Sequence, residues 1–327
     1  MDEPLNQDSA VDELVFKSVG IIADNQTLSG AYPASPNFEP YKYCWFRDGS
    51  FIADAMSRAG QVKSAEQFFD WCADIILARK SQIENGQPLD ARYTYDGQAA
   101  DGDWQTFQLD GYGLWLWALA GHARRTERPI DKYRPAIDLS ILYLEKHWQE
   151  PCFDWWEETK GVYPATLACI FAGLAAFNHP KAEQVRQAID IKSARTDASL
   201  LICPVLGAVS QEGFAPTLAD IEQRIVDPEG GVHRYADDEY YGGGQWILLA
   251  GLLGWQYMLA GRREEARQKL DWIVRRAQPN GWLAEQLPNH LLKPVSYQSW
   301  LDRLGPPANP LLWSQAMFIT LASVLKT

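Results

Sequence analysis

The sequence predicts an all-α fold, an (α/α)6 toroid made of six helical hairpins. Two observations lead to this prediction. Apolar residues recur every three or four positions almost throughout the 327 residues, which is the period of an α-helix. Amphipathic segments also alternate along the chain with segments that are apolar nearly all round. An inner ring of buried helices wrapped by an outer ring of half-exposed helices accounts for this alternation.

The periodicity predicts helices over residues 9–23, 49–59, 62–80, 109–124, 130–148, 162–177, 180–194, 197–207, 217–226, 243–259, 262–277 and 310–325. The segment 62–80 is amphipathic: Ala65, Phe69 and Cys72 share one face, whereas Lys63 and Glu66 lie on another. Four segments are apolar nearly all round and are expected in the centre. They are residues 111–121, 161–177, 244–261 and 311–325.

The connections between these helices are of two kinds. Gly60, Gly121, the His179-Pro180 pair and Gly261 mark short turns between hairpin partners. The connections that lead into the next inner helix are longer, and they cover residues 41–48, 101–110, 152–158, 195–197, 230–244 and 281–310. In a toroid of hairpins they emerge at one end, so we expect them to form a functional funnel there. No linker-like stretch divides the chain, so residues 1–327 are expected to form one domain.

The composition excludes some classes of function. With 30 basic and 42 acidic residues the formal net charge is −12, which repels polyanions and anionic membranes, so neither nucleic acid nor a membrane is expected as a partner. The apolar runs fall short of the roughly 18 residues that indicate a membrane span. The 14 Trp, 14 Tyr and 12 Phe residues are the unusual feature, since aromatic rings form good platforms for sugars.

The five cysteines are odd in number and widely spaced, and no C-x-x-C occurs. This pattern favours neither a disulfide framework nor a zinc site, and it fits a reducing compartment. Residues 1–7 are acidic and polar, without the basic and apolar regions of a signal peptide. We therefore expect a cytoplasmic protein, provided that no signal peptide has been removed.

Three acidic residues lie close to aromatic residues in the long connections. Glu157 and Glu158 follow a Phe-Asp-Trp-Trp stretch, and Glu285 follows Gly281-Trp282-Leu283-Ala284. Glycoside hydrolysis requires two such carboxyl groups, one to protonate the leaving oxygen and one to activate water or attack. The alternative is that Glu157 and Glu158 are solvated loop acids or charges at the start of a helix, which is the common situation for acidic pairs.

Further candidates for binding lie in the same connections. Arg47 and Asp48 can grip neighbouring hydroxyls of a sugar, although Asp48 is also placed to cap the helix expected at residue 49. Trp104, with Gln108 and Asp110, offers a ring beside an amide and a carboxylate, unless the ring only packs on the next hairpin.

The block 234–246 is dense in aromatic and charged residues and contains three successive glycines. No Lys-Ser or Lys-Thr follows these glycines, so a phosphate-binding loop is not indicated. Asp237, Asp238 and Glu239 do not have the spacing of a calcium-binding loop. No metal and no cofactor are therefore expected.

Together these blocks resemble glycoside hydrolase family 15, the glucoamylase-like exo-α-glucosidases. The resemblance covers almost the whole chain. The matching blocks are Gln26-Thr27-Leu28-Ser29-Gly30-Ala31, Tyr41-x-Tyr43-x-Trp45-x-Arg47-Asp48, Trp104 with Gln108-x-Asp110-Gly111, the stretch 153–158, Arg234-Tyr235 through Tyr240-Tyr241 to Trp246, Glu285-Gln286, and Leu312-Trp313-Ser314. The family fold is an (α/α)6 barrel, in agreement with the fold predicted from periodicity.

The resemblance implies that Glu157 is the general acid and Glu285 the general base of an inverting reaction that releases β-glucose. It also implies a binding site for the sugar. The residues expected in that site are Tyr41, Trp45, Arg47, Asp48, Trp104, Gln108, Asp110, Trp156, Glu158, Arg234, Tyr240 and Trp246. The chain is short for the family and lacks the β-sandwich that precedes many bacterial members, so the expected substrate is a short α-gluco-oligosaccharide, α-1,4 or α-1,6 linked.

Two other hypotheses remain open from the sequence. One is a trehalase or another α-glucosidase of the same fold. A phosphorylase of this fold is disfavoured, because Glu285 supplies the base that such enzymes usually lack. The other is a non-catalytic glucan-binding or regulatory module, which we would expect to lack one of the two acids.

Overall fold

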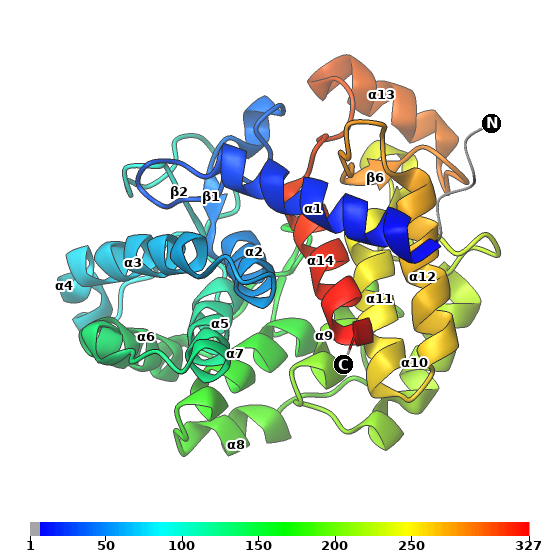
Figure 1. Cartoon of the computed structure of the whole chain (residues 1–327). Helices are drawn as coiled ribbons and strands as arrows, with labels where there is room; N and C mark the ends of the chain where they lie inside the picture. The colour runs from blue at the N-terminus through cyan, green and yellow to red at the C-terminus, as the bar shows by residue number, and fades with distance from the viewer. Residues whose placement is uncertain (1–6, 327) are drawn as a thin grey trace.

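The helices form two concentric rings, which confirms the predicted all-α toroid (Figure 1). The computed structural model describes residues 7–326; the acidic stretch 1–6 lies outside the described residues. The inner ring consists of α2 (Phe46–Arg58), α5 (Asp110–Thr126), α7 (Pro164–Ala176), α9 (Ile202–Val205), α11 (Ile247–Leu259) and α14 (Leu312–Lys326). Each of these helices contacts the next, and α14 contacts α2, so the ring closes.

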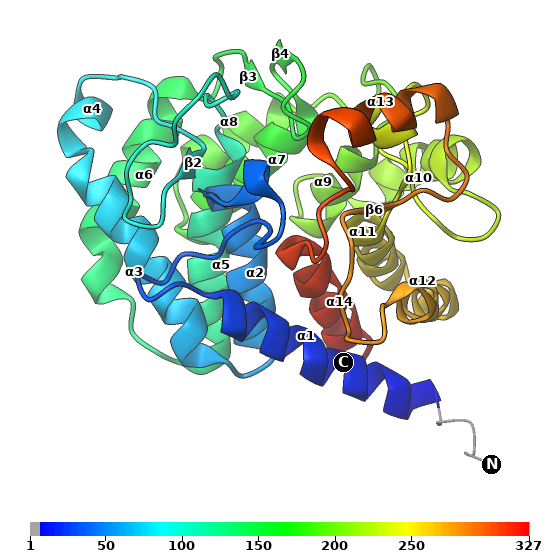
Figure 2. The same ribbon diagram turned by 90° about the horizontal axis from the view of Figure 1, so that it is seen from above.

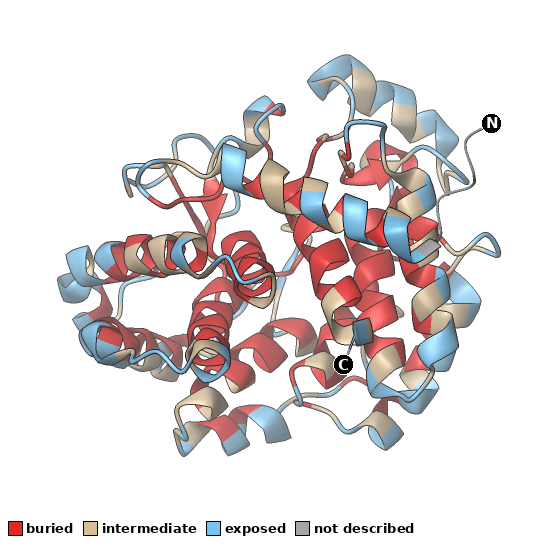
Figure 3. Cartoon of the chain, viewed as in Figure 1, coloured by how far each residue is buried: buried red, intermediate tan, exposed pale blue. Residues whose placement is uncertain are grey.

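The outer ring consists of α1 (Gln7–Asn25), α3 (Val62–Ala78), α6 (Arg134–His147), α8 (Lys181–Gln187), α10 (Gln211–Ile225) and α12 (Arg263–Arg276). Most outer helices follow their inner partner directly in the chain. The exception is α1, which packs on α14, so the sixth pair joins the two ends of the chain. Figure 3 shows the expected difference in burial: the inner helices are almost wholly buried, whereas the outer helices are exposed along one side.

Glycines allow the inner helices α5 and α7 to approach closely. A Cβ atom on Gly113 would lie 2.3 Å from the carbonyl oxygen of Cys169, and one on Gly173 would lie 2.5 Å from that of Gly113. No side chain larger than hydrogen fits at either position without moving a backbone. The glycines within these apolar segments therefore serve helix packing.

The least regular part of the ring differs from the prediction. The helix expected over 180–194 ends at Gln187, because the Asp190 carboxylate accepts hydrogen bonds from the backbone of Lys192 and Ser193 and forms a turn. The helix expected over 197–207 is a 3-10 turn, η3 (Ala198–Leu201), followed by the short α9.

The helix expected over 217–226 starts earlier than predicted. The Ser210 side chain caps α10 by accepting a hydrogen bond from the Gly213 N–H at 3.1 Å, and the helix continues through Pro216 to Ile225. The proline does not end the helix, although a proline within a helix usually interrupts it.

Short elements in the connections complete the fold. They are α4 (Lys80–Glu84), α13 (Pro294–Leu304), η1 (Glu39–Tyr41), η2 (Asp131–Tyr133) and η4 (Tyr240–Gly242). Neither α4 nor α13 was expected as a separate helix. Seen from above in Figure 2, α13 lies at the same end of the molecule as the strands β3 and β4, apart from both rings.

Three two-stranded antiparallel ladders fasten the long connections. They pair β1 (Cys44–Trp45) with β2 (Arg92–Tyr93), β3 (Cys152–Phe153) with β4 (Lys160–Gly161), and β5 (Gln245–Trp246) with β6 (Gln286–Leu287). The register of the third ladder sets Trp246 opposite Gln286, which brings Glu285 beside the block 234–246. Residues some forty positions apart are therefore held together by backbone hydrogen bonds.

Candidate active site

The long connections converge on one pocket of about 450 Å3. Five of the six connections contribute lining residues, as the hairpin topology predicts. The sixth, residues 195–197, does not line the pocket, but the buried Asp197 accepts hydrogen bonds from the Trp156 indole at 3.0 and 3.1 Å. The expected site residues found in the lining are Tyr41, Trp45, Arg47, Asp48, Trp104, Trp156, Glu157, Glu158, Arg234, Tyr240, Trp246 and Glu285.

Gln108 and Asp110 do not line the pocket, although both were expected to contact substrate. They are 1% and 2% exposed and lie behind the wall, where they accept hydrogen bonds from the Arg47 guanidinium at 2.7 and 3.0 Å. Because α2 begins at Phe46, Arg47 and Asp48 lie in its first turn. The residue that caps α2 is Trp45, so Asp48 is not the helix cap that the alternative reading assumed. Gln108 and Asp110 thus position Arg47 in the pocket.

Glu157 lies in a turn between β3 and β4, and no helix starts there. Its φ of 63° is unusual for a residue with a side chain, and such backbone conformations concentrate at functional sites. One carboxylate oxygen accepts hydrogen bonds from the Trp45 indole at 2.8 Å, from Arg47 at 3.0 Å and from Gln108 at 2.9 Å. The other oxygen accepts one from the Trp104 indole. Glu157 is therefore fixed in position by groups from two other connections, residues 41–48 and 101–110.

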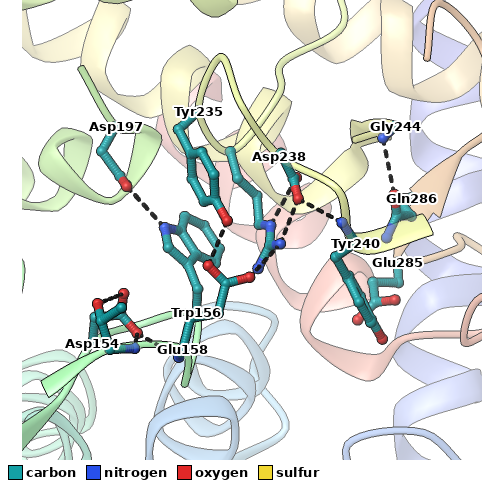
Figure 4. A network of polar contacts seen from close by, with 12 residues as sticks. Asp154, Trp156, Glu158, Asp197, Tyr235, Asp238, Tyr240, Gly244, Glu285 and Gln286 are labelled. Carbon is teal, nitrogen blue, oxygen red and sulfur yellow. Dashed lines mark hydrogen bonds and ion pairs between the residues drawn. The ribbon is translucent and has the colours of Figure 1, made fainter. Parts of the chain in front are cut away.

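Glu158 points to a different part of the pocket. Its carboxylate accepts hydrogen bonds from Arg234 at 2.8 Å and from the Tyr235 hydroxyl. Arg234 also pairs with the buried Asp238 through two hydrogen bonds, at 2.8 and 2.5 Å. Figure 4 shows Glu158, Asp238 and Tyr240 around this network. The Arg234 guanidinium is thus held by two carboxylates in a buried setting.

Glu285 lies just before β6 and is only 1% exposed. One of its carboxylate oxygens accepts a hydrogen bond from the Tyr41 hydroxyl at 2.8 Å, and the Tyr41 hydroxyl also lies 3.0 Å from that of Tyr240. The other oxygen, Oε2, has no hydrogen-bond partner among the described residues. Burial raises the pKa of Glu285 to about 7.

Asp48 behaves similarly. Burial raises the pKa of its carboxyl to about 7, although the Arg47 guanidinium, 3.6 Å away, acts in the opposite direction. Two buried carboxyls that take up protons near neutral pH in one pocket are typical of a site for acid–base chemistry.

Several lining residues were not among the expected site residues. Trp155 and Trp313 help to form the buried inner end, whereas Trp300, Arg303 and Leu304 come from α13 at the mouth. The sequence does carry a signal for α13, since Pro294 stands at its first position and Gly305, with φ 79°, follows its last.

The described residues contain no group of three or more His, Cys, Asp or Glu side chains placed to hold a metal ion. Between residues 7 and 326, no helix is long and apolar enough to cross a membrane.

Comparison with known proteins places the chain among glycoside hydrolases. A family model described as glycosyl hydrolases family 15 matches residues 12–182. The chain is 38% identical to an isomaltose glucohydrolase of Kribbella flavida, with 96% of this chain and 92% of that protein covered. It is 36% identical to a solved glycosidase in complex with glucose, with a TM-score of 0.93 and 99% of each chain covered. The glucoamylase of Saccharomycopsis fibuligera shares the fold alone, at 15% identity and a TM-score of 0.80 over 98% of this chain and 96% of that one.

The double ring of helices and its carboxylate-lined pocket, taken with these similarities, identify a glycoside hydrolase. The match of the family model and the extent of the similarity to the Kribbella protein also show the family. The chain belongs to glycosyl hydrolases family 15.

Proposed function

We propose that the protein is an exo-acting, inverting α-glucosidase that releases β-glucose from the non-reducing end of short α-gluco-oligosaccharides. One observation carries the proposal: Glu157 and Glu285, which are far apart in sequence, line the same pocket. Two carboxyl groups on either side of a glycosidic bond are what this hydrolysis requires. The buried inner end of the pocket, where Leu248 and Trp313 lie, suits the binding of a chain end.

In this mechanism Glu157 is the general acid and protonates the glycosidic oxygen. Its position supports the assignment, because its side chain is 11% exposed, whereas that of the neighbouring Glu158 is 35% exposed. A proton donor that is shielded from bulk water delivers its proton to the substrate rather than to solvent. Glu158 then contributes to substrate binding.

Glu285 is the general base. Tyr41 holds one of its oxygens, and the free Oε2 is available to accept a proton from the attacking water. That water attacks the anomeric carbon on the face opposite the leaving oxygen, so an α-linked sugar leaves as β-glucose. Arg47, Asp48 and Arg234 supply the charged groups that hold the hydroxyls of the terminal glucose.

The proposed substrate is a disaccharide or short oligosaccharide with an α-1,6 or α-1,4 linkage. The similarity to an isomaltose glucohydrolase favours the α-1,6 linkage. Glucose release from four disaccharides, with α-1,4, α-1,6, α-1,3 and α,α-1,1 linkages, tests this proposal. Fastest release from the α-1,6 disaccharide supports it, fastest release from the α,α-1,1 disaccharide indicates a trehalase, and no release from any of them contradicts the enzymatic function.

We expect activity to fall on the acidic side as pH drops through about 7, because Glu285 takes up a proton there and can no longer accept one from water. Asp48 titrates in the same range, so the acidic limb reports both carboxyls. A plot of kcat/KM against pH tests the prediction, and a profile that stays flat across the acidic and neutral range contradicts it.

Two further expectations accompany this function. We propose that the chain acts as a single catalytic domain, because all but one of its long connections supply residues to the one pocket. We also propose a cytoplasmic location, since all five cysteines are buried free thiols, as a reducing compartment allows.

A further inference from the structure

The helix α13 lies at the mouth of the pocket rather than in either ring. It is inserted between Glu285 and α14, and none of its residues is buried. Trp300, Arg303 and Leu304, at spacings of three and four, share one helix face and line the pocket, whereas Val295 is 91% exposed. A helix with no place in the core but with one face on the active-site pocket calls for a functional explanation.

Both ends of α13 are tied to the segment 240–243. The Lys293 N–H donates a hydrogen bond to the Gly242 carbonyl at 2.9 Å, before the helix starts. The Tyr241 hydroxyl donates to the Gly305 carbonyl at 2.9 Å, after the helix ends. Between these points the Trp300 ring packs edge-on against Tyr240, with 4.9 Å between ring centroids. The helix is therefore held at a fixed place relative to the catalytic pocket.

The lining residues of α13 belong to the outer part of the pocket. Arg47 and Asp48, at the inner end, are 5% and 7% exposed, whereas Leu304 is 37% exposed and Arg303 is also exposed. In a pocket that receives a chain end, the terminal glucose occupies the inner part, and the sugar that leaves occupies the outer part. The α13 face thus lies where the leaving sugar must be.

Arg303 differs from the other two arginines of the pocket. Arg47 and Arg234 are each held by carboxylates. The Arg303 guanidinium forms no ion pair and no hydrogen bond with any residue between 7 and 326, and it lies over the Trp300 ring, 4.2 Å from the centroid. A guanidinium carries five N–H donors and no acceptor, so these donors remain open to the oxygens of a ligand. The contact with Trp300 orients the cation.

We propose that Arg303 is a specificity residue that donates hydrogen bonds to the hydroxyls of the leaving sugar, and that Trp300 is the residue that positions it. This inference rests on the proposed function. In this proposal α13 forms the wall of the pocket on the side of the leaving sugar. Recognition of that sugar then depends on a helix that carries neither Glu157 nor Glu285.

The test compares two substrates that share the glucosyl group. One is the disaccharide that the parent enzyme cleaves fastest, and the other is α-glucosyl fluoride, which has no leaving sugar. Arg303→Ala is expected to lower kcat/KM for the disaccharide about tenfold, as expected for a lost hydrogen bond to a charged donor. The same variant is expected to change kcat/KM for the fluoride by less than about twofold. Trp300→Leu is expected to show the same selectivity with a smaller loss.

Val295→Ala is the matched control, since Val295 is on the same helix but does not line the pocket. It is expected to leave both substrates unaffected. If the parent enzyme hydrolyses both substrates, the inference is overturned when Arg303→Ala lowers kcat/KM equally for both of them or lowers it for neither. Failure of the parent enzyme to hydrolyse either substrate overturns the proposed function instead, so the two failures are distinguishable.

Discussion

Replacing Glu285 with glutamine is expected to lower kcat for the preferred disaccharide by about 10²–10⁴-fold, the usual contribution of a general base. Glutamine keeps an oxygen that can accept the hydrogen bond from Tyr41, so the fold and the shape of the pocket should persist. It cannot take a proton from water, and Oε2 is the oxygen that does so in the proposed mechanism. Steady-state kinetics on the disaccharide, with thermal unfolding as a check on folding, measure the effect.

Two further measurements make this prediction specific to the base. Glu239→Gln is the control, because Glu239 is an exposed acid of the block 234–246 that does not line the pocket. The activity of this variant should match that of the parent enzyme. In Glu285→Ala, added azide should partly restore consumption of α-glucosyl fluoride, since azide attacks without needing a base. A Glu285→Gln enzyme as fast as the parent would show that Glu285 is not the base.

Replacing Glu157 with glutamine is expected to have a large effect that depends on the leaving group. The second sugar of a disaccharide leaves as an alkoxide unless the glycosidic oxygen is protonated. Without the acid, kcat for the disaccharide should therefore fall about 10²–10⁴-fold. Fluoride leaves with little need for a proton, so kcat for α-glucosyl fluoride should fall at most about tenfold in the same variant. The ratio of the two losses separates the role of a general acid from general damage to the pocket.

The neighbouring residue provides the control for this variant. Glu158 lies in the same turn and also lines the pocket, but its carboxylate contacts Arg234. Glu158→Gln is therefore expected to raise KM for the disaccharide with a much smaller change in kcat. If instead Glu158→Gln shows the loss that depends on the leaving group and Glu157→Gln does not, the acid is Glu158 and the assignment is reversed.

Much of the fold could be predicted from the sequence, because the inner and outer helices differ in chemistry. A segment such as α11, which is apolar all round, has no stable place except the centre, whereas α3 carries charges on one face and must meet water. The prediction failed where local hydrogen bonds override this pattern. Asp190 ends α8 early, and the Ser210 cap starts α10 before Pro216. Such single contacts leave little trace in apolar periodicity.

The sequence could predict which residues gather at the site, but not which of them face the pocket and which lie behind its wall. Most expected residues line the pocket, because they occur in connections that the topology gathers at one end. Periodicity cannot distinguish a residue that faces the pocket from one that supports it, so Gln108 and Asp110 were expected in the lining although they lie behind Arg47. The contribution of α13 was missed because the long connection 281–310 was taken as a single loop, despite the helix signals at Pro294 and Gly305.

In the proposed mechanism two glutamates act on one α-glucoside from opposite sides, one on the leaving group and one on the incoming water. Time-resolved NMR of the glucose released from α-glucosyl fluoride is the sharpest test, because this substrate yields a single glucose whose anomer is identified before the two forms equilibrate. An inverting reaction releases β-glucose first, and α-glucose follows only by equilibration. Initial release of α-glucose would contradict this mechanism, since retention requires a covalent intermediate on a carboxylate in place of an activated water.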